Sequence, residues 1–238
     1  MFESLYVAMV HAAARPLRAI GLLSRLERAP RDSLRFWIGS QFAIHDATRL
    51  AQLDVPWWSL SAIERVERWI RARDGQVRVF EYGSGASTAW LARRCREVVS
   101  VEHDAGFARH IAPMLAQDNV TLRLIEPQRN VKAPAVASGR HGYEECDFSA
   151  YVDGILDGGG RYDLVIVDGR ARSACLARAR ACLNDSGLIV FDNSNRLRYQ
   201  AALARIDLPL ERLRGRAPAL PYPTETALIG YPSKGTTA

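Results

Sequence analysis

The chain has 238 residues, 48% of them hydrophobic and 24% charged, which fits one globular domain with a substantial core. Its net charge of +6 comes almost wholly from arginines scattered along the chain, a distribution typical of a solvated exterior rather than a nucleic-acid groove. The positive balance favours an acidic substrate or surface, and no apolar run is long enough to span a bilayer.

The cysteine pattern indicates neither a zinc site nor a disulfide framework. The four cysteines form no CxxC pair and have no histidine at ligand spacing; they are Cys95, Cys146, Cys175 and Cys182. Reduced thiols indicate a cytoplasmic protein. The N-terminus agrees, because Glu3 stands where a signal peptide would be positively charged.

Residues 1–56 read as a helical N-terminal extension, with Leu17, Ile20 and Leu23 at helical spacing and arginines on the other faces. Such an amphipathic helix docks on its own domain, pairs with a second copy or lies on an anionic membrane surface, and docking is the commonest of the three. The next helix is expected to start at the capping-box pair Ser61 and Glu64 and to stop at 74–75.

In residues 57–238, short apolar β-rich runs alternate with helix-length segments. The runs are "VRVFEYG", "VVSVEHD", "VTLRLI", "YDLVIVDG" and "GLIVFDN". This alternation predicts a Rossmann-like, doubly wound and mostly parallel sheet of seven strands. Two final runs, joined by a proline-rich turn, predict an antiparallel C-terminal hairpin that closes the sheet. The ligand site is expected at the carboxyl ends of the strands.

A long polar interval separates the third and fourth predicted strands. Residues 127–160 are too many for a bare connection, so we expect a helix near "FSAYVDGIL" and a loop that covers the site. Loops in this position often carry substrate contacts, which makes His141 and Tyr143 candidates.

The stretch "FEYGSGASTAW" carries the clearest chemical signal. A strand runs into a tight turn in which Gly83 and Gly85 allow a ligand to approach the backbone closely. Glu81 supplies a carboxylate suited to an ammonium group or a water network, and Glu102 follows at the spacing of an acid that binds ribose hydroxyls. Thr88 replaces the third glycine of a dinucleotide fingerprint.

These motifs, together with "YDLVIVDGRAR" and "VFDNSNR", resemble class I S-adenosylmethionine-dependent methyltransferases, and in particular a bacterial subgroup with poorly defined substrates. The resemblance implies that the glycine turn holds the methionine part of the cofactor and that Glu102 holds the ribose. The candidate cofactor-binding residues are Glu81, Tyr82, Gly83, Ser84, Gly85, Ser87, Thr88, Glu102, His103 and Asp168.

Acidic and amide side chains end the fourth and fifth predicted strands at Asp168, Asp192 and Asn193, and adjacent strand ends share one crevice. These three residues resemble the Mg²⁺ ligands of catechol-type O-methyltransferases, although "DGRAR" lacks the lysine found there. The alternative is a metal-free site with Asp168 as general base. His103 and His141 are further candidates for proton removal.

Arg170 is a candidate for holding an anionic substrate group. The resemblance therefore implies an enzyme that methylates oxygen on a small molecule or glycan. A non-catalytic S-adenosylmethionine-binding scaffold and an NAD-dependent oxidoreductase are the alternatives, the latter disfavoured by Glu81 and the closing hairpin. Nucleic acid is not an expected partner, whereas peripheral membrane contact and a homo-oligomer stay open.

Overall fold

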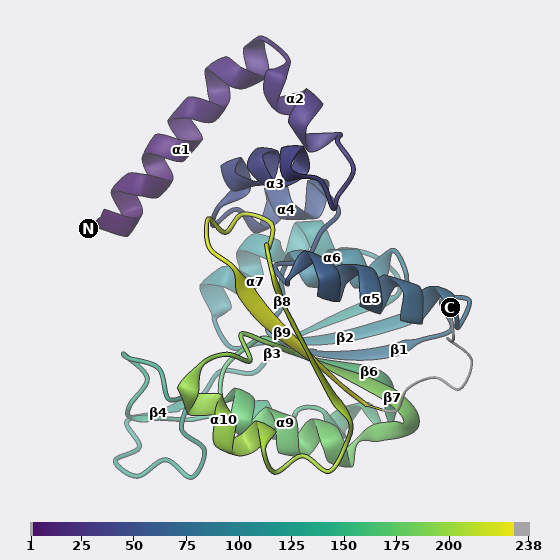
Figure 1. The fold of residues 1–238 in the computed structure, drawn as a ribbon. Helices are drawn as coiled ribbons and strands as arrows, with labels where there is room; N and C mark the ends of the chain where they lie inside the picture. Colours follow the sequence, from purple (N-terminus) through teal and green to yellow (C-terminus); the bar gives the residue numbers. More distant parts are fainter. Residues whose placement is uncertain (1, 231–238) are drawn as a thin grey trace.

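The computed structural model describes residues 2–230, so the last residues of the predicted domain, 231–238, lie outside the described part. The chain begins with a series of helices (Figure 1). They are α1 (Phe2–Ala19), α2 (Leu22–Glu27), α3 (Leu34–Ser40), a 3-10 turn (Gln41–Ala43) and α4 (Ala47–Gln52).

The remaining elements build a sheet with helices on both faces. In chain order they are α5 (Leu60–Arg71), β1 (Arg78–Tyr82), α6 (Ala86–Ala92), β2 (Glu97–Glu102), α7 (Ala105–Ile111), β3 (Val120–Leu124), β4 (Gln128–Arg129), β5 (Cys146–Asp147), α8 (Ser149–Asp153), β6 (Tyr162–Val167), α9 (Arg172–Ala181), β7 (Leu183–Asp192), α10 (Leu197–Leu203), β8 (Leu210–Gly215) and β9 (Thr224–Gly230). Short 3-10 turns follow α7 (Ala112–Leu115) and α8 (Leu156–Gly158).

The main sheet has seven strands in the order β3-β2-β1-β6-β7-β9-β8. The first five in this order run parallel, and β9 pairs antiparallel with both β7 and β8. This topology confirms the predicted fold class, including the hairpin at the C-terminal edge.

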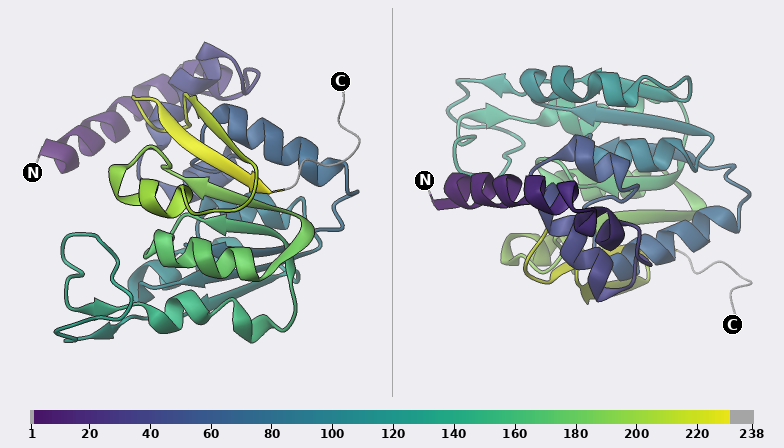
Figure 2. Two further views of the ribbon diagram at one scale, coloured as in Figure 1. Left: turned by 60° about the horizontal axis from the view of Figure 1, so that its bottom comes forward. Right: turned by 90° about the horizontal axis from the view of Figure 1, so that it is seen from above.

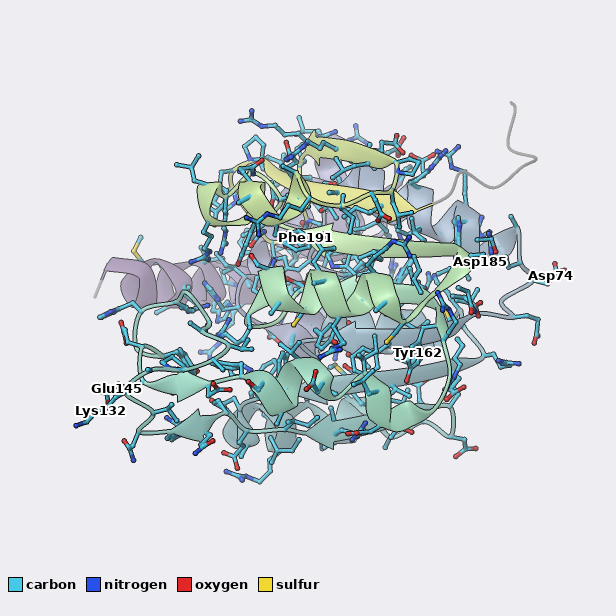
Figure 3. The ribbon with its side chains drawn as sticks, turned by 90° about the horizontal axis from the view of Figure 1, so that it is seen from below. Asp74, Lys132, Glu145, Tyr162, Asp185 and Phe191 are labelled. Atoms are coloured by element: carbon cyan, nitrogen blue, oxygen red, sulfur yellow. The ribbon has the colours of Figure 1, made fainter. Side chains whose placement is uncertain are left out.

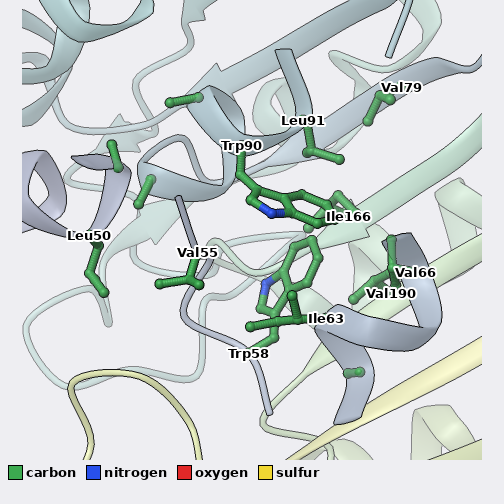
Figure 4. Close-up of a cluster of buried hydrophobic side chains, with 14 of the residues drawn as sticks. Leu50, Val55, Trp58, Ile63, Val66, Val79, Trp90, Leu91, Ile166 and Val190 are labelled. Atoms are coloured by element: carbon green, nitrogen blue, oxygen red, sulfur yellow. The ribbon is translucent and has the colours of Figure 1, made fainter. Parts of the chain in front are cut away.

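Successive strand residues point into two separate cores, as the two-residue period of a strand requires. Val79 faces a core shared with α5 and α6, whereas Phe80 faces a core shared with α8, α9 and α10. Figure 4 shows the first core, in which the rings of Trp58 and Trp90 meet edge to face at a centroid distance of 5.9 Å.

Helix α5 starts earlier than the capping-box pattern predicts. The N-cap is Ser59, whose Oγ accepts the backbone N–H of Ala62 at 3.4 Å. Ser61 is already inside the helix, so the prediction of a start at Ser61 is wrong by two residues. The structure selects Ser59 because its backbone N–H is tied to Thr226 Oγ1 of β9 at 3.2 Å, which fixes where the helix can begin.

The N-terminal helices differ in how closely they join the sheet. Phe36 of α3 and Leu50 of α4 belong to the same buried core as Trp58 and Trp90. Helix α1 packs on α2 and on the 3-10 turn after α3, and extends along the outside of the molecule (Figures 1 and 2). Over the described residues, no helix combines the length and apolarity needed to cross a membrane.

The interval between β3 and β6 contains α8, as predicted near "FSAYVDGIL", and also a short antiparallel β4–β5 pair that the sequence does not signal. Figure 3 shows this insertion, with Lys132 and Glu145, at the end of the sheet opposite to Asp74 and Asp185. Asp74 precedes β1 and Asp185 lies early in β7, so the insertion stands at the carboxyl ends of the parallel strands.

Candidate functional site

A cavity of about 610 Å³ opens at the carboxyl ends of β1, β2, β6 and β7. The insertion contributes Arg140 and Tyr143 to its wall, the segment before α5 contributes His45 and Trp57, and the hairpin turn contributes Tyr222. The location is the one expected for a doubly wound sheet.

The glycine turn forms the floor of the cavity, and its two glycines have different reasons to be there. Gly83 has φ +93°, and a Cβ at this position would lie 2.7 Å from the Cα of Gly169, so the ends of β1 and β6 touch through their backbones. A Cβ at Gly85 would meet nothing within 4 Å. Because Gly85 lines the cavity, its missing side chain leaves space for a ligand.

Glu81 lies beneath this turn, fully buried, and the described walls of the cavity do not include it. Its carboxylate accepts hydrogen bonds from Ser87 Oγ at 2.5 Å, from Ser100 Oγ at 2.6 Å and from the Thr88 hydroxyl. Thr88 Oγ1 in turn accepts the Gly85 N–H at 2.9 Å. The structure thus places Glu81 and Thr88 as the internal support of the turn, whereas Ser84 and Ser87 reach the cavity itself.

Burial has a large electrostatic effect on Glu81. Desolvation raises the pKa of this carboxyl to about 7, because the loss of water outweighs the hydrogen bonds of Ser100, Ser87 and Thr88, which lower it.

Glu102 closes β2 on the neighbouring wall. Its Oε1 accepts the backbone N–H groups of His103 at 2.7 Å and of Asp104 at 2.8 Å, and lies 2.6 Å from His103 Nδ1. The other imidazole nitrogen lies 3.3 Å from the hydroxyl of Tyr143 in the insertion. The second oxygen, Oε2, makes no hydrogen bond in the described part of the chain, so one face of the carboxylate is available to a ligand.

Asp168 and Asp192 do meet at one edge of the cavity, but a guanidinium group stands between them. Arg172 Nη2 is 2.6 Å from Asp168 Oδ1, and Nη1 is 3.8 Å from Asp192 Oδ2. The same side chain donates to the backbone carbonyls of Asp168 and Asp192 at 2.7 and 2.6 Å. Burial raises the pKa of both carboxyls, and for Asp192 the nearby Asp168 charge raises it further.

This arrangement does not fit the magnesium site that the resemblance implied. Arg172 supplies the positive charge that a metal would bring, and Asp192 Oδ1 and Oδ2 accept hydrogen bonds from Thr226 Oγ1 at 2.9 Å and Asn193 Nδ2 at 2.6 Å. Among the side chains that the structure describes, in residues 7–230, no group of three or more His, Cys, Asp or Glu is placed to hold a metal ion.

Two further candidates lie outside the cavity. The Tyr82 ring is fully buried under the turn, and its hydroxyl donates to the Val152 carbonyl at 2.6 Å. His141 is fully exposed and pairs with Glu144 at 2.9 Å, because the loop that carries it turns the side chain to solvent. No role in the cavity is proposed for His141.

Arg172, Arg140, His45 and Tyr222 line the cavity without having been singled out from the sequence. Arg172 could have been predicted from the sequence, because it follows Asp168 by four residues in "DGRAR". The prediction from that stretch named Arg170 instead. The other three come from segments far from the strand-end motifs, and their convergence depends on the tertiary fold.

No family model and no curated protein matches the chain. Three solved structures illustrate its similarities. A methyltransferase-like protein from Silicibacter pomeroyi has 22% identity and TM-score 0.44, with 70% of this chain and 86% of that chain covered. The O-methyltransferase TomG from Streptomyces achromogenes, solved with S-adenosylmethionine, has 18% identity and TM-score 0.49, with coverages of 79% and 90%. The N-methyltransferase NodS from Bradyrhizobium japonicum has 13% identity and TM-score 0.45, with coverages of 71% and 93%. These similarities are distant. The strand order, with its antiparallel β8–β9 edge, agrees with the class I methyltransferase fold that the resemblance implies.

Proposed function

We propose that the protein is an S-adenosylmethionine-dependent methyltransferase that methylates a hydroxyl oxygen of a small molecule or glycan unit. The observation that carries the proposal is that two features lie side by side. One is a glycine turn with space above Gly85, and the other is Glu102 on the adjacent strand, which has one carboxylate oxygen without a hydrogen bond among the described residues. Gly85 leaves room for the amino-acid part of the cofactor, and Glu102 Oε2 is available for two ribose hydroxyls.

The residues present fit this cofactor at the turn. Gly83 and Gly85 let the ligand approach the backbone, and Glu81 holds the turn in shape through Ser87 and Thr88. When bound, the cofactor supplies an electrophilic methyl group. The protein then has two tasks, which are to align the acceptor oxygen and to accept its proton.

Asp168 is our candidate for accepting that proton. Its side chain lines the cavity at 22% exposure, and burial raises its pKa, which makes it a stronger base than an ordinary aspartate when ionised. Arg172 keeps the carboxylate ionised and oriented. This base supports oxygen as the acceptor atom, because a neutral hydroxyl is a poor nucleophile until its proton is removed.

We also infer a cytoplasmic location, which is supported by the four cysteines: all are free and buried.

Calorimetric titration of the full chain with S-adenosylmethionine, S-adenosylhomocysteine and NAD tests the cofactor assignment. We expect both sulfur ligands to bind and NAD not to bind. The variant Glu102→Ala should lose this binding, whereas Glu211→Ala, which removes an exposed carboxylate on β8, should retain it. Binding of NAD alone would contradict the proposal.

Metabolite and glycan comparison between deletion cells and cells complemented with wild type or Asp168→Asn separates an enzyme from a scaffold. An enzyme predicts a product heavier by one CH₂ group only in the wild-type complement. A scaffold predicts no such product in either strain.

A further inference from the structure

The lining of the cavity includes a cluster of positive charge. Its members are Arg140, Arg170 and Arg196, which we call the arginine cluster. Arg140 comes from the insertion, Arg170 from the turn after β6, and Arg196 from the N-cap position of α10. Three segments that are distant in sequence thus direct guanidinium groups at one space.

Within the described residues the nearest negative charge that acts on the arginine cluster is Asp168, which is already paired with Arg172. Burial raises the pKa of this carboxyl, and the charges of Arg172, Arg196 and Arg170 oppose the rise. In the described part of the chain, none of the cluster's members forms an ion pair with a carboxylate. Arg140 and Arg196 are exposed, but Arg170 is half-buried, and most other buried or half-buried arginines of the described chain do form such a pair. Asp54, for example, holds Arg93 and Arg94 at 2.7 and 2.5 Å, and Arg172 is held by Asp168. In addition, Arg170 Nε is buried without any hydrogen-bond acceptor. A buried donor in this state is destabilising until an acceptor arrives.

The members of the cluster are close enough to repel one another. The charge of Arg170 is the main cause that lowers the pKa of Arg140, and Arg196 and Arg198 add to the effect. Arg198 itself donates to the Gly139 carbonyl at 3.0 Å, so the loop beside Arg140 is tied to α10. The fold therefore holds like charges together, and an anion bound between them would relieve the repulsion.

Arg170 is also oriented toward the cavity by its neighbour. Its guanidinium carbon lies 5.4 Å from the centre of the Tyr143 ring, which limits how the group can turn. Tyr143 in turn contacts His103, beside Glu102. The arginine cluster is thus one wall of the same cavity that contains the proposed cofactor position and Asp168.

We propose that the methyl acceptor carries a phosphoryl group, that the arginine cluster binds this group, and that the bound group brings an acceptor hydroxyl to Asp168. The proposal rests on the proposed function and names its substrate class. Several guanidinium groups around one site favour a multiply charged tetrahedral oxyanion over a single carboxylate, because each planar fork can bind two of its oxygens.

The test is calorimetric titration of the full chain, loaded with S-adenosylhomocysteine, with pyrophosphate and, for comparison, with the dicarboxylate malonate. Wild type is compared with Arg170→Gln and with Arg96→Gln. Arg96 is exposed and immediately precedes β2, at the amino edge of the sheet, so this control removes the same charge far from the cavity.

We expect pyrophosphate to bind wild type and Arg96→Gln alike, to bind Arg170→Gln about tenfold more weakly, and to be preferred to malonate. Equal binding to wild type and Arg170→Gln, an equal loss in Arg96→Gln, or equal affinity for malonate would each overturn the proposal. If S-adenosylhomocysteine itself fails to bind, it is the proposed function that fails. If it binds and pyrophosphate does not, only the phosphoryl inference is lost.

Discussion

Replacing Glu81 by glutamine should change how the stability of the protein depends on pH. The carboxyl has a pKa of about 7 when folded and an ordinary value of 4.5, so the folded state binds more protons than the unfolded state between these values. Its contribution to stability is therefore fully present below pH 4.5 and is lost as the pH rises through about 7. A difference of this size corresponds to about 3 kcal/mol in the free energy of unfolding.

Glutamine keeps the shape of the side chain and one acceptor oxygen for the hydroxyls of Ser87, Thr88 and Ser100, but it does not titrate. Urea unfolding at several pH values between 5 and 8 measures the effect. We expect wild type to lose stability across this range and Glu81→Gln to lose about 3 kcal/mol less of it. Asp192 has a pKa raised in the same direction, so some of the decline should remain in the variant.

Glu211→Gln, at an exposed position on β8, is the matched control and should reproduce the wild-type pH dependence. The carboxylates whose pKa values are lowered to about 2, Asp54 and Asp147, lose their contributions only below the range measured. Parallel curves for wild type and Glu81→Gln would refute the reasoning, because they would mean that burial does not perturb this carboxyl.

Three further predictions concern the floor and the edge of the cavity. Gly83→Ala should destabilise the protein by about 2–4 kcal/mol, because its φ is positive and its Cβ would clash with the Gly169 backbone. Gly85→Ala should keep the wild-type melting temperature but weaken S-adenosylhomocysteine binding by about tenfold or more. Arg172→Gln should cost about 3–5 kcal/mol in urea unfolding at pH 8 and less at pH 5, where the two facing carboxyls are more protonated; a pH-independent loss would count against the assigned ion pairs. Mg²⁺ or EDTA should change neither the melting temperature nor turnover, and a rise in melting temperature with Mg²⁺ would contradict the role given to Arg172.

The class of the sheet and the direction of its strands could be predicted because the signals are local. Continuous apolar runs, a glycine turn and a proline-rich connection each fall within a short stretch, and together they fix the sheet class. The boundary at residue 56 stays a prediction. Helices α3 and α4 share the hydrophobic core of the sheet domain, so side-chain packing does not mark a domain boundary at this residue.

The candidate site was harder to predict, because tertiary packing determines how deeply each side chain is buried and which groups it contacts. The sequence places Glu81 beside the glycines, but only the fold turns it away from the cavity toward Ser100 on β2. Because adjacent strand ends share one crevice, the sequence correctly predicts that Asp168 and Asp192 lie close together. It does not predict that Arg172 lies between them. His141 lies on a long loop, where sequence patterns say little about which way a side chain points.

Because the Gly83 and Gly169 backbones touch, some of the residues that line the cavity tolerate substitution much less than others. The turn after β1 and the turn after β6 have no room for a side chain where they touch, so the proposed cofactor floor and Asp168 form one closely packed block. Arg140, Trp57 and Tyr222 come from three segments outside that block. A relative could therefore acquire a different acceptor by exchanging these segments alone, and the same division makes the chain a convenient scaffold for redesigning acceptor choice without touching the chemistry.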